Sequence, residues 1–101
     1  EIVEAVRKAG QFQAQINTLE QRLNQLRRDV QSIESDQGRI RSNMGSIDRN
    51  SDLYRRYMTR LNEQENELES LRNRIEETER SLNEARGQLS AYLGSLSRQN
   101  R

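Results

Sequence analysis

Apolar residues recur at alternating steps of three and four from Ile2 to Ile47, so this stretch follows one heptad register. The register has fourteen core positions, of which thirteen are apolar and one is Gln37. Apolar heptads that continue beyond three or four repeats are typical of a coiled-coil helix. The pattern therefore predicts a long helix with the core residues Ile2, Ala5, Ala9, Phe12, Ile16, Leu19, Leu23, Leu26, Val30, Ile33, Gln37, Ile40, Met44 and Ile47.

A second heptad register begins at Tyr54 and predicts a second long helix. A step of seven from Ile47 reaches Tyr54, but that position has changed its role in the repeat, so the two registers are out of phase. Such a phase break marks either a three-residue insertion in a continuous coil or a place where the chain turns back. The core residues of the second register are Tyr54, Tyr57, Leu61, Gln64, Leu68, Leu71, Ile75, Thr78, Leu82, Ala85, Leu89, Tyr92 and Leu96.

The stretch "SNMGSIDRNSDLYRRY", in which the phase breaks, favours a turn. Gly45 is suited to end a helix, and Asp48, Asn50, Ser51 and Asp52 are good turn and N-cap residues. We therefore expect an all-α fold: an antiparallel two-helix coiled-coil hairpin with a tip near residues 46–52. The alternative is a long parallel homodimeric coiled coil with a phase break near residues 47–50.

The hairpin divides the 101 residues into one arm at about 1–46, a tip at about 47–52 and a second arm at about 53–98. The chain starts with Glu1 rather than Met and has no signal-peptide pattern, so we expect a single helical-hairpin segment of a larger protein. The arms can be paired so that large core residues face small ones and Gln37 lies beside Gln64. The same register places like charges together, with Glu34 near Glu65 and Glu20 near Glu79, but surface charge pairs contribute less than core layers.

Composition narrows the classes of function. Apolar residues make up 31% of the chain and charged residues 33%, which is too little apolar material for a spherical core but enough for a narrow helical seam. Cysteine and histidine are absent and the net charge is +1. The thiolate and imidazole groups of many catalytic and zinc sites are therefore missing. We expect no catalytic residue, no metal site, no cofactor and no membrane span.

The tip is the candidate site. Arginines cluster there with two tyrosines and a few aspartates, and the cluster is either a contact surface or a structural lock for the turn. The candidate residues are Arg39, Arg41, Asn43, Asp48, Arg49, Asp52, Tyr54, Arg55 and Tyr57, together with the polar core pair Gln37 and Gln64.

These features predict a non-catalytic coiled-coil spacer or protein-interaction arm. Its partner is expected to be a protein, either another domain of the parent chain or a separate molecule. One alternative is an arm that binds nucleic acid or another anion through the tip, although a local excess of three positive charges is small for that role. The other is a parallel dimerisation module, so a monomeric hairpin is favoured and a homodimer is the alternative.

The segment "DQGRIRSNMGSIDRNSDLYRRYMTRLNEQENELESLR" resembles part of a bacterial family, the mucoidy-inhibitor-A-like proteins. The resemblance covers about a third of the chain, and the arms around it are generic coiled coil. It implies a large parent chain that combines β-rich domains with coiled coils, no known enzyme activity, and a place in the bacterial cell envelope. The residues that carry it are Asp36, Gln37, Arg39, Ile40, Arg41, Asn43, Ser51, Leu53, Tyr54, Arg56, Tyr57, Leu61, Gln64 and Glu65.

Overall fold

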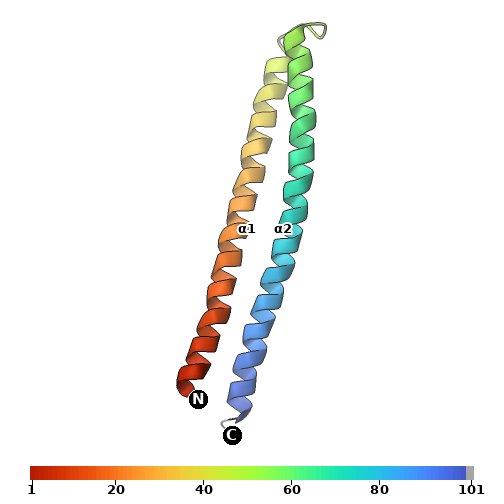
Figure 1. Ribbon diagram of the computed structural model, residues 1–101. Coiled ribbons are helices and arrows are strands. Elements are labelled where there is room, and N and C mark those ends of the chain that lie inside the picture. The colour runs from red at the N-terminus through yellow and green to blue at the C-terminus, as the bar shows by residue number, and fades with distance from the viewer. Residues whose placement is uncertain (100–101) are drawn as a thin grey trace. The chain divides into compact units, whose positions relative to one another are not determined.

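The computed structural model describes residues 1–99, which form two long helices and no strand. Helix α1 spans Ile2–Met44 and helix α2 spans Asp52–Gln99. The chain turns back between them, so the fold is the expected all-α antiparallel hairpin and not one continuous helix (Figure 1). The connecting segment comprises residues 45–51, one residue earlier than the sequence predicts.

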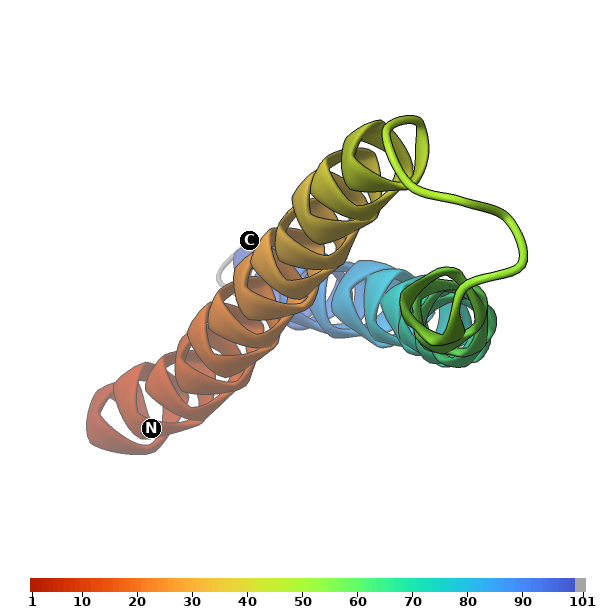
Figure 2. The same ribbon diagram turned by 90° about the horizontal axis from the view of Figure 1, so that it is seen from above.

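The residue contacts divide the hairpin into two units, each made of one piece of α1 and one piece of α2. One unit pairs Glu1–Asn24 with the segment that starts at Glu76, and the other is the continuous stretch Gln25–Ile75, which contains the tip. Within each unit the two helical pieces lie side by side (Figure 1). Seen from above, the connecting segment runs as an open loop from the end of α1 to the start of α2 (Figure 2).

Every buried side chain of the tip-containing unit lies on the predicted seam. Its buried apolar residues are Leu26, Ile40, Leu68 and Leu71, and the two glutamines of the predicted polar layer are buried with them. Because each helix has only a narrow apolar stripe, it can remove that stripe from water only by facing the stripe of the other helix. The unit therefore depends on a single line of layers rather than on a globular core.

The other unit is built in the same way around Ile16, Leu19, Leu23, Leu82 and Ala85, with Thr78 also buried. Towards its open end the ring of Phe12 contacts the ring of Tyr92, with 5.8 Å between their centroids. The Lys8 Nζ atom lies 5.0 Å from the centroid of the Tyr92 ring, within the range of a cation–π contact. Ile2, predicted as a core residue, is instead 80% exposed at the first position of α1.

The charges beside the seam contradict the sequence prediction. Glu34 pairs with Arg72 (3.9 Å) and not with Glu65, and Glu20 pairs with Arg86 (3.0 Å) and not with Glu79. In both cases the partner lies one heptad further along α2, because these long side chains reach diagonally across the seam. The expected clash of like charges is thus replaced by ion pairs.

The ion pairs of the tip-containing unit alternate in sign along each helix. Arg41 pairs with Glu65 (3.9 Å) one heptad away from the pair between Glu34 and Arg72. A slip of one heptad would bring Glu34 to Glu65 or Arg41 to Arg72. Each exposed pair stabilises the fold by only about 0–1 kcal/mol. The alternation therefore contributes more to the choice of register than to stability.

Neither helix, over the described residues 1–99, offers an apolar stretch of the kind that crosses a bilayer. This agrees with the sequence prediction on that point.

The seam can be tested with one substitution at two sites of α2. Leu68 is 2% exposed and Leu93 is 48% exposed. Leu68→Ala should lower the free energy of unfolding by about 2–4 kcal/mol, because it leaves a cavity in a layer with no neighbouring core to collapse into it. Leu93→Ala, the matched control, should change it by about 0.5 kcal/mol or less. Urea unfolding followed by circular dichroism measures both, and equal effects would contradict the single-seam description.

Candidate functional site

The turn is held by side-chain caps at the start of α2. The Ser51 Oγ atom accepts a hydrogen bond from the Tyr54 amide (3.1 Å), so Ser51 is the N-cap of α2. The same hydroxyl donates to the Asp48 carbonyl (2.6 Å), while the Asp48 side chain accepts from the Asn50 amide (2.9 Å). Asp48, a candidate residue, therefore helps to close the turn, as the lock interpretation predicts.

Helix α1 ends one residue before Gly45, but Gly45 does not act as a left-handed cap. No described residue has a positive φ. The Gly45 amide instead donates to the carbonyls of Arg41 and Ser42 (both 3.3 Å), and the Ser46 hydroxyl donates to the Asn43 carbonyl (3.0 Å). The helix thus ends by tightening its last turn, a common way to satisfy the final carbonyl groups.

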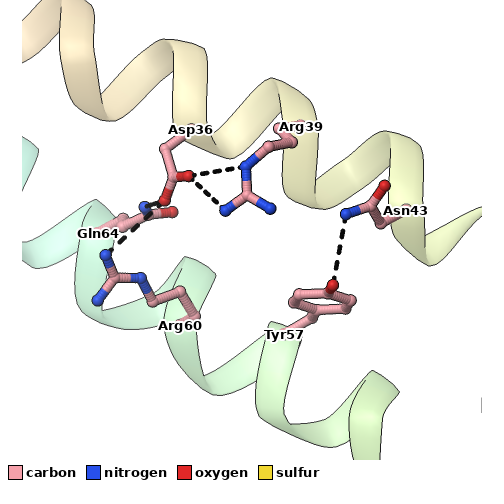
Figure 3. Close-up of polar contacts among 6 residues, drawn as sticks. All are labelled: Asp36, Arg39, Asn43, Tyr57, Arg60 and Gln64. Atoms are coloured by element: carbon pink, nitrogen blue, oxygen red, sulfur yellow. Dashed lines mark hydrogen bonds and ion pairs between the residues drawn. The ribbon is translucent and has the colours of Figure 1, made fainter.

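Three polar side chains converge on Asp36, which lies on α1 beside the seam (Figure 3). Its Oδ1 atom accepts hydrogen bonds from the Nε (3.2 Å) and Nη2 (2.6 Å) atoms of Arg39. Its Oδ2 atom accepts from Nε2 of Gln64 (2.6 Å) and lies 3.8 Å from Nη2 of Arg60. Asp36 therefore ties three side chains from both helices together.

The hydrogen bond from Arg39 is the main reason why the pKa of the Asp36 carboxyl is lowered from its ordinary value of 3.8. The hydrogen bond from Gln64 and the charges of Arg39 and Arg60 lower that pKa further, against partial burial, which raises it. The same contact with Asp36 raises the pKa of Arg39. Both shifts follow from a mutual ion pair, so they indicate a structural role for these two residues.

The two glutamines of the polar core pair are buried, and each is bonded to an acidic residue of the other helix. Gln37 is 4% exposed and Gln64 is 2% exposed. Each amide group donates to the acidic residue that neighbours the other glutamine: Gln37 Nε2 to Glu65 Oε1 (2.9 Å) and Gln64 Nε2 to Asp36 Oδ2 (2.6 Å). The two bonds are related by the antiparallel symmetry of the hairpin. Both bonds cross between the helices in the layer where the sequence places Gln37 beside Gln64.

The layer has one unsatisfied group, the Gln64 Oε1 atom, which is buried without a hydrogen-bond partner. Turning the amide around would place this oxygen against the Asp36 carboxylate, so the observed orientation is the better one. A buried carbonyl without a partner costs about 1–3 kcal/mol. The layer is therefore a poor source of stability and a good determinant of which residues face each other.

The remaining candidate residues fall into two groups. Asn43 donates a long hydrogen bond to the Tyr57 hydroxyl (3.4 Å), and Asp52 pairs with Arg55 (2.9 Å) within the first turn of α2. Tyr54 is half-buried. The contacts of Asn43, Asp52, Arg55 and Tyr57 are therefore made within the tip itself.

Arg49 differs from them. It is exposed on the connecting segment, and no hydrogen bond or ion pair to it exists within residues 1–99. Arg56 on α2 was not among the candidate residues. Its side chain is also exposed and has no hydrogen bond or ion pair within residues 1–99. Arg41 is intermediate, because the one ion pair that it makes within residues 1–99, to Glu65, is long at 3.9 Å.

The candidate residues did not include Asp36, which contacts Arg39, Gln64 and Arg60, nor Arg60 itself. A signal was present: the order Asp36-Gln37 on one arm is mirrored by Gln64-Glu65 on the other. In an antiparallel pair a mirrored acid–amide order places each acid beside the opposite amide.

No group of three or more potential metal-ligating side chains is present among the described residues. The chain matches no protein-family model, no curated protein and no solved structure. The resemblance of residues 36–72 to the mucoidy-inhibitor-A-like proteins stays a prediction.

The Asp36 contacts predict a pH dependence. Because folding lowers the pKa of Asp36, its contribution to stability is complete above the unfolded value of about 3.8 and is lost as the pH falls through the lower folded pKa. In a carbon-13 NMR titration the Asp36 carboxyl should titrate below 3.8. In Arg39→Gln its midpoint should rise, since the main hydrogen bond is gone. An unchanged midpoint in that variant would contradict the assignment.

We expect that removal of the glutamine layer raises the stability of the hairpin and makes its register less specific. Gln37→Leu combined with Gln64→Leu should raise the free energy of unfolding by about 1–2 kcal/mol, because it buries apolar groups and removes the unsatisfied oxygen. It should also permit a slip of one heptad, about 10 Å along the seam. Spin labels at the exposed positions Gln31 and Glu69 measure this. A second distance should appear in the variant, and a single distance would show that the other layers fix the register.

Proposed function

We propose that this chain is a non-catalytic protein-interaction arm of a larger protein, in which the paired helices provide reach and the tip contacts the partner. The observation that carries the proposal is that some charged side chains near the tip are bonded to each other while others have no partner. The polar side chains that face the seam, such as Asp36 and Arg39, are bonded to each other. The guanidinium groups of Arg49 and Arg56 are exposed and without a partner in residues 1–99.

Apolar exposure at the same place supports a protein partner. Leu53, at the second position of α2, is 45% exposed, and Ile47 on the connecting segment is half-buried. Exposed apolar side chains beside unpaired arginines are typical of protein contact surfaces, where arginine is enriched. Nucleic acid is a weaker candidate, because Arg39 and Arg55 are already paired with Asp36 and Asp52 and the tip also carries Asp48.

A non-catalytic role is supported by the chemistry of the side chains. The sequence has no histidine and no cysteine. The lowered pKa of Asp36 comes from its hydrogen bonds to Arg39 and Gln64, which occupy both carboxylate oxygens. A carboxylate used in this way holds the helices together and is not poised to exchange protons with a substrate.

Site-specific photo-crosslinking in cells that produce the protein tests the proposal. A photoreactive amino acid replaces Arg56 at the tip or, as the matched control, Arg80 in the middle of α2, which is also exposed and unpaired within residues 1–99. We expect position 56 to yield one discrete protein adduct and position 80 to yield none. Adducts of equal strength at both positions would assign the contact to the arms. A nuclease-sensitive adduct would favour the nucleic-acid alternative.

A further inference from the structure

A hollow opens on one side of the tip, and its lining combines apolar side chains with two cations. Its floor is formed by Met44, Ile47, Tyr54 and Leu61, all of them half-buried. Arg41 and Arg49 line it as well. The lining comes from the end of α1, the connecting segment and the start of α2, so the hollow exists only because the chain turns here.

The two arginines are available to a ligand. Arg49 has no partner in residues 1–99. Arg41 reaches Glu65 only at 3.9 Å, and the same Glu65 oxygen already accepts a hydrogen bond from Gln37 at 2.9 Å. A carboxylate at the hollow could therefore take up Arg41 without breaking a short bond. Glu65 would keep its bond to Gln37, and the seam would stay intact.

The floor is apolar and incompletely covered, which sets a second requirement. Four partly exposed apolar side chains around one hollow favour an apolar group of the ligand, because burying it removes further apolar area from water on both sides. A ligand with charge alone would leave the apolar side chains of the floor exposed to water. A ligand with an apolar group alone would leave two guanidinium groups next to it uncompensated.

We infer that the hollow binds an acidic peptide segment of the partner protein, with one apolar side chain on the floor and carboxylates on Arg49 and Arg41. Guanidinium groups bind carboxylates through short, charge-assisted hydrogen bonds, which fix the orientation of the segment. A phosphate backbone fits less well, since Asp48 and Asp52 stand in the same turn and Tyr54 alone offers an aromatic face to a base in the lining. This inference rests on the proposed function and specifies the class of partner.

The probe is a synthetic eight-residue peptide of alternating glutamate and aspartate with a central Leu-Phe pair. It is titrated into the protein while the methyl signals of Met44 and Ile47 are followed by NMR. We expect these signals to shift in a saturable way and the affinity to fall as salt rises. The same peptide with Ser-Ser at its centre should bind at least about tenfold more weakly. A version with lysine in place of its acidic residues should not bind.

Arg49→Glu is the decisive variant and Arg80→Glu, on α2 away from the tip, is its matched control. Both positions are exposed and unpaired within residues 1–99, and both changes reverse one charge, but only Arg49 lines the hollow. Arg49→Glu should weaken binding at least about tenfold and Arg80→Glu by about twofold or less. Circular dichroism of each variant verifies that the hairpin is folded. Equal losses would reduce the contact to bulk charge and overturn the inference, as would the absence of any methyl shift.

The outcome separates this inference from the proposed function. Crosslinking at position 56 together with failure of the acidic peptide would leave the tip as the contact and overturn only the class of partner. Peptide binding without a crosslink to any protein in cells would support the hollow and count against the proposed function.

Discussion

The structure depends on the burial of two narrow apolar stripes against each other. Each helix is charged over most of its surface and carries one apolar residue at alternating steps of three and four. Such a helix gains little by itself, since most helix stability in proteins comes from packing of the apolar face. Once α1 and α2 face each other, every layer has only two neighbours along the seam, and each contributes to stability almost separately.

A seam of repeated apolar layers has a weakness, because one layer resembles the next and the helices can slip. The polar layer of Gln37 and Gln64 opposes such a slip, because each amide donates a hydrogen bond to the acid next to the opposite glutamine. The alternating ion pairs beside the seam act in the same direction. The polar layer lowers stability and the exposed ion pairs raise it only slightly, so the main effect of both features is that one register is preferred over its neighbours.

The conformation of the tip also depends on a few polar contacts. Hydrogen bonds of Asp48 and Ser51 close the turn, and Asp36 fastens the helices below it, so the backbone is set by a small number of polar contacts. Arg49, which has no partner within residues 1–99, lines an apolar hollow together with Arg41, whose ion pair to Glu65 is long. In the proposed interaction, a turn that is already closed by these hydrogen bonds would need little further ordering on binding.

The sequence by itself determined the helices, the place of the turn and most of the seam, because heptad spacing and the cluster of turn residues are local properties. It placed Gln37 opposite Gln64, since that register matches large residues with small ones. It failed for the charges: Glu34 and Glu20 were assigned to glutamates one heptad away from their actual arginine partners. It also left Asp36 out of the candidate residues. Only the tertiary structure decided these points, because the reach of long side chains across the seam depends on the rotation of both helices, which spacing along one chain does not specify. The same holds for the hollow at the tip, whose lining is brought together from three segments by the turn.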